Sequence, residues 1–241
     1  MNANPDIFER LYRRSTRYLP ASLAARVDLM RPAYRQGWGG PMNGQEGRQQ
    51  IVRDLFSTIR FDEVVETGTF RGGTTGWLHE VSGLPVFSVE SEDRFYRFAH
   101  AMLRTQPQVD VRLGDSRDLL RSLAERPGDK TSFFYLDAHW GEDVPRHEEL
   151  RLIHPRWQRC VVMIDDFQVP GDPGYGFARY GGKPLDETYL PDLPGWTLFY
   201  PTIASADETG SRRGCAVFAS EALTTQVAQV HGLREARRWE K

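Results

Sequence analysis

Acidic residues recur in this sequence directly after short apolar runs. They stand at Glu66, Glu90, Asp115, Asp137 and the pair Asp165–Asp166. A single acidic residue in this position often only caps the helix that follows. Several carboxylates brought to one edge of a sheet could instead bind hydroxyl groups, hold a cation or accept protons. The elements that carry them decide between these roles.

From Phe61 onward, strand-like and helix-like segments alternate along the chain. The strand-like runs are Glu63–Glu66, Val86–Glu90, Val109–Leu113, Ser132–Asp137 and Cys160–Asp165, and the helix-like stretches begin near Thr74, Glu92, Ser116 and Pro145. This alternation is typical of βαβ units in a parallel sheet. Right-handed crossovers bring the carboxyl ends of the strands to one edge, and ligands bind in the crevice outside them. We therefore expect an α/β, doubly wound fold with its site at the strand ends.

The stretch 61–78, FDEVVETGTFRGGTTGWL, has the pattern of a strand, a glycine-rich loop and the start of a helix. A dinucleotide site would need glycine where Glu66 stands, because the backbone there approaches a pyrophosphate. A carboxylate repels phosphate groups, but it tolerates S-adenosylmethionine, which carries a sulfonium and an ammonium and no phosphate. Gly68, Gly72 and Gly73 would keep the loop clear for the methionine and ribose of this cofactor. Hydride transfer with a dinucleotide is disfavoured for the same reason.

Two further carboxylates suit the rest of this cofactor. Glu90 ends the second strand roughly 20 residues after the glycine loop, where a carboxylate typically binds two ribose hydroxyls. Asp115, which follows VRLG, could accept a hydrogen bond from the adenine amino group.

These segments together resemble a known family. ETGTFRGG, Glu90 after VFSV, LGDS at Gly114–Ser116 and YLDAHW at Tyr135–Trp140 are similar to the successive motifs of class I S-adenosylmethionine-dependent methyltransferases. The resemblance extends from Phe61 to about Ser220, where Trp196–Pro201 and Gly214–Ser220 are similar to the closing hairpin that makes the last strand antiparallel. It implies a Rossmann-like methyltransferase fold with a seven-stranded, mostly parallel sheet. The predicted cofactor-binding residues are Glu66, Gly68, Thr69, Gly72, Gly73, Thr74, Glu90, Ser91, Asp115, Ser116 and Asp137.

Three carboxylates should converge beside the cofactor. Asp137 and Asp165 end neighbouring strands about 5 Å apart, and Asp166 opens the next loop. They repel one another unless protons or a cation intervene, and oxygen-only ligands suit Mg²⁺, with Ca²⁺ or Mn²⁺ as looser fits. IDDF at Ile164–Phe167 resembles the metal-dependent, macrocin-type sugar O-methyltransferases. The resemblance implies an enzyme that methylates a hydroxyl of a small molecule, such as a sugar or another natural product.

His139 and Asp137 are the candidate catalytic residues. A bound cation lowers the pKa of a hydroxyl and orients it, and His139 could serve as general base or contact the acceptor. A histidine bonded to a loop carbonyl is an equal alternative. The sequence AHWGEDVPRHEEL after Asp137 departs from the sugar enzymes, in which acidic and small residues are expected there. A metal-independent methyltransferase that uses His139 alone, and a cofactor-binding scaffold without catalysis, therefore stay open.

The long segment Gln168–Pro184 is rich in glycine and also carries Tyr175, Phe177, Arg179 and Tyr180. Glycine hinges and aromatic faces would suit a lid over an acceptor ring. An ordinary surface excursion with its aromatic side chains turned inward fits the same pattern.

Composition limits the other possibilities. The 241 residues carry a formal net charge of −2, with no basic excess or base-gripping motif to favour nucleic acid. Cys160 and Cys215 lie in apolar runs, which predicts buried thiols in a reducing, cytoplasmic protein. The amino terminus is too charged for a signal peptide, and no apolar stretch reaches the roughly 20 residues of a membrane span.

The first 45 residues differ from the rest. Helical patterns at Asp6–Tyr18 and Ala21–Met30 precede a hinge-like segment, Gly37–Gly47, and a further helical pattern at Gln45–Ile59. We expect residues 1–45 to form a helical arm beside the cofactor site and residues 46–241 to form the cofactor-binding domain. The amphipathic pattern of the arm is also consistent with homo-oligomer formation.

Overall fold

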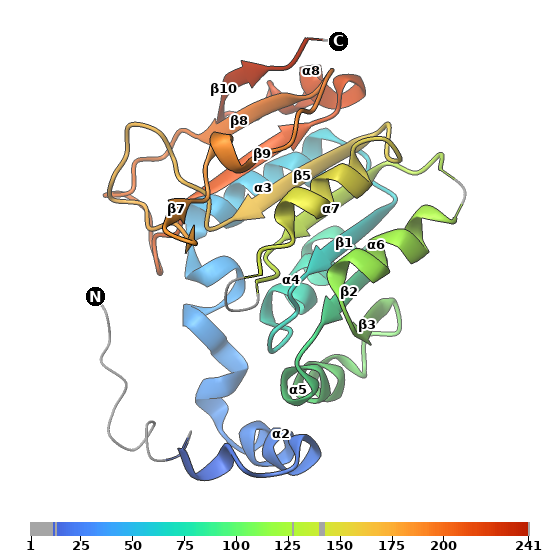
Figure 1. The fold of residues 1–241 in the computed structure, drawn as a ribbon, viewed down its shortest axis with the longest axis vertical. Helices are drawn as coiled ribbons and strands as arrows, with labels where there is room; N and C mark the ends of the chain where they lie inside the picture. Colours follow the sequence, from blue (N-terminus) through green and yellow to red (C-terminus); the bar gives the residue numbers. More distant parts are fainter. Residues whose placement is uncertain (1–11, 13, 127, 140–142, 241) are drawn as a thin grey trace.

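One large sheet organises the chain in this computed structural model, which describes residues 12, 14–126, 128–139 and 143–240. Its strand order is β10-β8-β9-β5-β4-β1-β2-β3. The strands are β1 (Glu63–Thr67), β2 (Val86–Glu90), β3 (Val109–Leu113), β4 (Ser132–Leu136), β5 (Cys160–Asp165), β8 (Thr197–Pro201), β9 (Cys215–Ala219) and β10 (Leu233–Arg238). The parallel strands predicted from the sequence are confirmed. Figure 1 shows the sheet running from β10 at one end to β3 at the other.

The sheet is parallel through β1 to β5 and antiparallel beyond. β9 pairs antiparallel with both β5 and β8, as the resemblance implied. The sheet has eight strands rather than the seven expected, because β10 pairs antiparallel with β8 at the edge. The sequence of β10, LREARR, leaves five of its six residues exposed, so it lacks the apolar alternation that identifies a half-buried strand. Charged side chains on such an edge discourage pairing with another chain.

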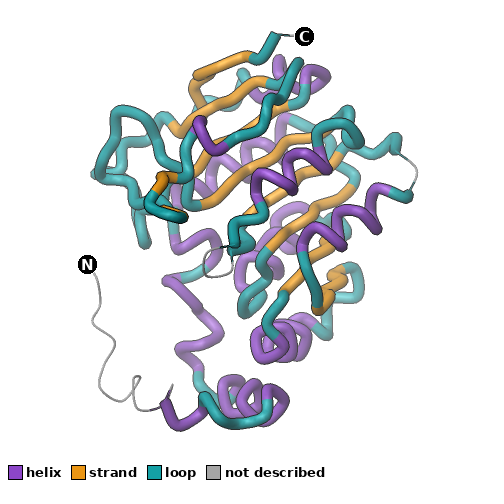
Figure 2. The backbone as a smooth tube through the Cα atoms, in the orientation of Figure 1, coloured by secondary structure: helices purple, strands orange, loops and turns teal. Residues whose placement is uncertain are grey.

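Side chains alternate between the two faces of the sheet and build two cores. Val64, Phe133 and Met163 point into one core, whereas Val65 and Phe134 point into the other. Helices cover both faces, as the tube drawing shows (Figure 2). The first core is covered by α3 (Glu46–Thr58), α4 (Gly73–Ser82) and α8 (Thr224–Val227), and the second by α6 (Ser116–Ala124) and α7 (Arg146–Ile153). Because β1 to β5 all run parallel, the loops that follow these strands lie together at one edge of the sheet.

The amino-terminal arm packs on helix α5 (Asp93–Leu103). Its helix α2 (Ala21–Leu29) lies against α5 at the end of the molecule far from β10 (Figure 1). Two 3₁₀ helices, η1 (Pro32–Gly39) and η2 (Pro41–Gly44), connect α2 to α3 where a hinge-like segment was expected. The helix expected at Asp6–Tyr18 lies largely outside the described residues. The division at residue 45 and self-association of the arm stay predictions.

A buried ion pair fastens the arm to α5. Asp28 is fully buried, and both of its carboxylate oxygens accept hydrogen bonds of 2.7 Å from Arg94. The hydroxyl of Tyr12 donates a third, also at 2.7 Å. Burying a carboxylate is costly unless it is paired in this way.

Both cysteines are buried free thiols, as predicted. Burial raises the pKa of each of them. None of the helices in the described ranges has the length and apolar character that crossing a membrane requires.

We predict that replacing Arg94 separates the arm from α5. Arg94→Ala leaves the Asp28 carboxylate buried without its cationic partner, so we expect a loss of about 3 kcal/mol in the free energy of unfolding. The matched control is Arg97→Ala on the same helix, because Arg97 forms an exposed pair with Asp93 worth under about 1 kcal/mol. Denaturant unfolding measures both. Equal effects of the two substitutions would contradict a structural role for the Asp28 pair.

Candidate active site

The loop after β1 is held close to the loop after β4. Gly68 has φ +88°, a conformation that favours glycine, and a Cβ added to it would lie 2.8 Å from the backbone nitrogen of Ala138. Gly72 is similarly confined, since its added Cβ would lie 2.8 Å from the side chain of Leu103. Gly73, at the start of α4, is exposed and faces open space. The glycines thus bring two strand-end loops together and leave the first turn of α4 accessible.

Glu66 is buried at the end of β1 and points toward α4 and β2. It accepts hydrogen bonds from Ser88, at 2.6 Å, and from Thr75. Its Oε1 atom has no hydrogen-bond partner among the residues that the structure describes. Burial raises the pKa of Glu66 to about 7, against the bonds from the two hydroxyls, which lower it. Glu66 is therefore poised to change its charge near neutral pH.

Glu90 holds the glycine loop from β2. Its carboxylate accepts hydrogen bonds from the backbone N–H groups of Phe70, at 2.7 Å, and Glu92, at 2.9 Å. Burial raises its pKa. The adjacent Ser91 is exposed at the crevice edge of the sheet. A carboxylate that joins two strand-end loops is well placed to bind ribose hydroxyls, which stays a prediction.

Asp115 caps helix α6. It accepts from the backbone N–H of Arg117 at 2.8 Å and forms an ion pair with the Arg117 guanidinium at 2.5 Å. Hydrogen bonding to Arg117 lowers its pKa. The next residue, Ser116, is buried beside Glu149, a fully buried carboxylate of α7. Asp115 is thus a helix cap, as the simpler interpretation held, and its contact with adenine stays a prediction.

Two threonines of the predicted set have protein partners. The Thr69 hydroxyl lies 2.6 Å from that of Ser88, so it joins the network around Glu66. The Thr74 hydroxyl accepts a 3.0 Å hydrogen bond from the backbone of Met42 in η2. Thr74 therefore ties the amino-terminal segment to the first turn of α4.

A candidate metal group lies at the ends of β4 and β5. Ligand atoms of Asp137, His139 and Asp166 all lie within 4.8 Å of one another. Asp166 adopts a left-handed backbone conformation, with φ +61°. Non-glycine residues rarely adopt this conformation outside turns and functional sites. In this conformation the Asp166 carboxylate lies in the group with Asp137 and His139.

Asp165, which we predicted as a metal ligand, does not belong to this group. It is buried and accepts hydrogen bonds from Arg48, from Tyr135 at 2.8 Å and from Asn43 at 2.8 Å. The backbone N–H of Asp166 donates a further hydrogen bond to the Asp165 carboxylate, at 2.7 Å. Against the cost of burial, the Arg48 guanidinium holds the pKa of Asp165 below its usual range. The oxygens that would bind an ion are therefore already occupied by protein donors.

Arginines also accompany the other two carboxylates. Arg213 donates to Asp166 at 2.5 Å, and Arg146 lies 3.6 Å from Asp137. Burial and the neighbouring carboxylates nevertheless raise the pKa of Asp137 well above its usual value. Partial desolvation and the nearby Arg146 charge lower the pKa of His139, although its side chain is exposed at the surface. A lowered pKa favours the neutral imidazole, which is the form able to accept a proton.

Several residues that build this site were not predicted from the sequence, namely Asn43, Arg48, Tyr135, Arg146 and Arg213. A signal was available for two of them. Arg48 precedes Ile51 and Val52 on the apolar stripe of α3, and Arg146 lies on the stripe of α7 that includes Leu150. A charged residue on an otherwise buried stripe indicates a buried partner.

Hydrogen bonds to the rest of the fold hold the first half of the segment Gln168–Pro184, which follows β5. Asp172 accepts from the Ser205 backbone at 2.7 Å, and Tyr175 is buried with its hydroxyl bonded to Ile203. The second half forms a small hairpin, β6 (Arg179–Tyr180) and β7 (Lys183–Pro184). These attachments favour the surface excursion over a lid that moves as one unit.

Solved structures of methyltransferases share this fold. The O-methyltransferase from Bacillus cereus in complex with SAH is 16% identical, with a TM-score of 0.54, and the match covers 88% of this chain and 97% of that one. TomG from Streptomyces achromogenes, an O-methyltransferase involved in tomaymycin synthesis and solved with SAM, is 17% identical, with a TM-score of 0.53 and coverages of 88% and 96%. Cofactor-bound Rv0187 from MTB is 18% identical, with a TM-score of 0.55 and coverages of 90% and 97%.

No family model and no curated protein matches the sequence. The likeness is thus one of structure, and at these low identities it shows the fold alone. The chain has the Rossmann-like α/β fold of class I S-adenosylmethionine-dependent O-methyltransferases. The sequence resemblance is confirmed at this level.

We predict that Glu66 makes stability fall as the pH rises through neutrality. Its pKa is raised from 4.5 to about 7, so between these values the folded state binds more protons than the unfolded state. The free energy of unfolding should therefore decrease by roughly 2–3 kcal/mol between pH 5 and 8 on account of Glu66. Glu66→Gln removes this contribution, whereas the exposed Glu80→Gln on α4 keeps it. Denaturant unfolding at pH 5 and at pH 8 measures these free energies. If the free energy of unfolding fell by the same amount in Glu66→Gln as in wild type, Glu66 would not be the group responsible.

Proposed function

We propose that the protein is an S-adenosylmethionine-dependent methyltransferase that transfers a methyl group to a hydroxyl of a small molecule. One observation carries the proposal: a buried carboxylate oxygen, Oε1 of Glu66, has no hydrogen-bond partner among the described residues, at the strand end where the cofactor would lie. Native proteins rarely leave such atoms unpaired, so this edge of the sheet is suited to a polar ligand.

Three residues of the chain suit the chemical groups of the cofactor. Glu66 and Glu90 supply carboxylates for its cationic and hydroxyl groups, and Gly73 leaves the start of α4 open to it. When bound, S-adenosylmethionine supplies the methyl group on a sulfonium. Neutral His139 can take the proton of the acceptor hydroxyl as its oxygen attacks the methyl carbon. A carboxylate-lined crevice tolerates the positive sulfonium until the methyl group leaves it.

The group of Asp137, His139 and Asp166 fits a divalent cation that assists the reaction. Such an ion would supply positive charge that lowers the pKa of the acceptor hydroxyl. Because an imidazole replaces Asp165 in the set, the donors are mixed, which shifts the preference from Mg²⁺ toward transition ions such as Mn²⁺. His139 cannot bind the ion and accept the proton through the same nitrogen. The acceptor class, sugars included, is proposed from the sequence resemblance.

A metal-independent methyltransferase is the second candidate. The arginine partners of Asp165 and Asp166 favour it, because Arg48 and Arg213 already neutralise these carboxylates. In that case the carboxylates need no cation to offset them, and His139 is the base.

Cofactor binding tests the proposal first. We expect S-adenosylmethionine to bind wild-type protein in calorimetry, and Glu90→Ala to weaken it roughly 10- to 100-fold, because charged hydrogen bonds are each worth about 1.5–3 kcal/mol. The affinity of Glu90→Gln for S-adenosylmethionine should lie between those of wild type and Glu90→Ala. The exposed control, Glu80→Ala, should bind like wild type. Incubation with S-adenosylmethionine and a panel of sugars and phenols, read by mass spectrometry, then tests transfer. A wild-type protein that binds no S-adenosylmethionine would end the proposal.

Mn²⁺ binding separates the two candidates. Electron paramagnetic resonance should show Mn²⁺ bound to wild type and not to Asp166→Asn if the ion assists the reaction. Arg213→Ala should then bind Mn²⁺ more tightly, because it frees the Asp166 carboxylate. Glu187→Gln, which alters a carboxylate outside the group, is the control. Activity that survives chelation, with no Mn²⁺ bound to wild type, would establish the metal-independent candidate.

A further inference from the structure

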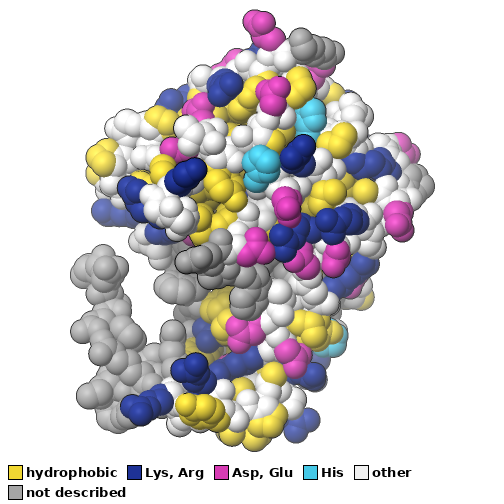
Figure 3. Space-filling view, viewed as in Figure 1, with side chains coloured by type: hydrophobic (Ala, Val, Ile, Leu, Met, Phe, Trp, Pro, Cys, Tyr) yellow, Lys and Arg dark blue, Asp and Glu magenta, His cyan; other side chains and the backbone are white. Residues whose placement is uncertain are grey.

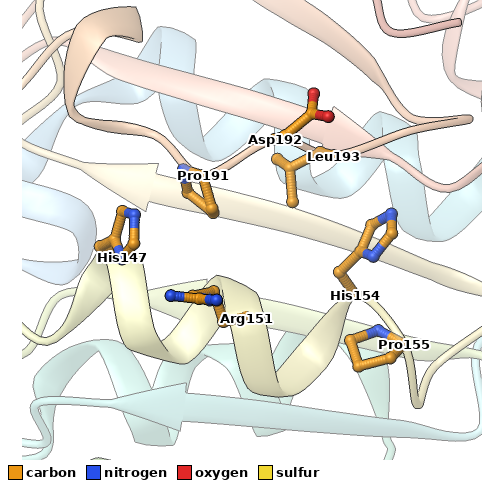
Figure 4. A pocket seen from close by; sticks show the side chains of 7 residues that line it. All are labelled: His147, Arg151, His154, Pro155, Pro191, Asp192 and Leu193. Carbon is orange, nitrogen blue, oxygen red and sulfur yellow. The ribbon is translucent and has the colours of Figure 1, made fainter.

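A second hollow lies outside the crevice, between α7 and the chain before β8. It encloses about 400 Å³ and is lined by His147, Arg151, His154, Pro155, Pro191, Asp192 and Leu193. Figure 4 shows the side chains of His147, Arg151 and His154 on the α7 side, with Pro191 and Leu193 opposite. Histidine side chains are visible at the surface of the face that α7 covers (Figure 3). Its volume is in the range of small-molecule sites, and nothing in the proposed reaction uses it.

The spacing along α7 brings the three nitrogen-bearing side chains to one stripe. His147, Arg151 and His154 stand at positions i, i+4 and i+7, which lie on one side of a helix. Aromatic neighbours place both imidazoles: the His147 ring meets Tyr189 edge-on at 6.2 Å, and His154 lies 5.2 Å from Trp196. His154 also donates through Nε2 to the Pro194 carbonyl at 3.0 Å. The walls of the hollow are therefore fixed by contacts behind them.

Arg151 is the unused charge in this hollow. Within the described ranges its side chain forms no hydrogen bond and no ion pair, although acidic residues are close in sequence. Glu148 is paired with Arg117 at 2.8 Å, and Glu149 is buried on the other side of α7. In Figure 4 the carboxylate of Asp192 points away from Arg151. The hollow thus presents a guanidinium and two imidazoles, and its one lining carboxylate, that of Asp192, points away from Arg151.

We propose that this hollow binds a phosphate monoester of a small organic molecule. The guanidinium fork offers two parallel N–H donors, and His147 offers another, so the several terminal oxygens of a phosphate can be bonded at once. The volume exceeds what a bare phosphate would fill, and the apolar walls of Pro155, Pro191 and Leu193 suit an organic group attached to it. The site is separate from the crevice, so it stands whether or not the methyltransferase proposal holds.

Phenyl phosphate is the probe that tests this site, because it joins a phosphate to an apolar ring. Calorimetry on the full chain should show binding that weakens roughly 10- to 100-fold in Arg151→Ala, the effect of losing one charge-assisted contact. Inorganic phosphate should bind at least about tenfold more weakly than phenyl phosphate, and neutral phenol should not bind. The control is Arg121→Ala, an exposed arginine of α6 paired with Asp118, which should bind phenyl phosphate like wild type.

Two outcomes would overturn the proposal. Equal affinity of wild type and Arg151→Ala for phenyl phosphate would show that the hollow is not the site. Equal affinity for phenyl phosphate and inorganic phosphate would show that the hollow binds an adventitious ion only. Arg151 is exposed, so the variant should fold normally, and an unchanged melting temperature verifies this independently of the probe.

Discussion

The ion pair between Arg48 and Asp165 joins the separate parts of the chain that form the crevice. Arg48 comes from α3 and Asp165 from the end of β5, and both side chains are 1% exposed. Tyr135 of β4 and Asn43 of η2 complete the bonds to the carboxylate. Arg48 also donates to the backbone carbonyl of Arg213. Removing two charges from water is expensive, and these hydrogen bonds to both partners offset the cost, although Nε of Arg48 has no partner among the described residues.

This pairing decides which carboxylates remain available for chemistry. With Asp165 committed to Arg48, the backbone turns through a left-handed conformation at Asp166, whose carboxylate then faces Asp137 and His139. Arg213 compensates Asp166 at 2.5 Å, whereas Arg146 is 3.6 Å from Asp137. Asp137 is therefore the least compensated of the three, which agrees with its strongly raised pKa. A proton, a cation or a cationic substrate group would each relieve the same repulsion.

The helices and most strands could be predicted from the sequence, but the partners of the charged side chains could not. Short apolar runs located β1 to β5 within a residue or so, because most of these strands are buried on both faces, which leaves little choice of side chain. The edge strand β10 was missed, since four of its five exposed residues are charged and it contains no apolar run. Adjacent aspartates such as Asp165 and Asp166 look equivalent in a sequence. Only the fold shows that one of them meets a buried arginine from a helix more than a hundred positions away.

The segment before α3 shows how this charge pairing reaches the cofactor loop. Met42 and Asn43 both adopt left-handed backbone conformations, with φ +49° and +62°, which cost of order 1–3 kcal/mol each for residues other than glycine. They are held there because the Met42 side chain is fully buried and Asn43 donates to Asp165. The Met42 N–H in turn binds Thr74, at the open start of α4. The conformation of the predicted cofactor loop and that of the acidic crevice are therefore linked through one strained turn.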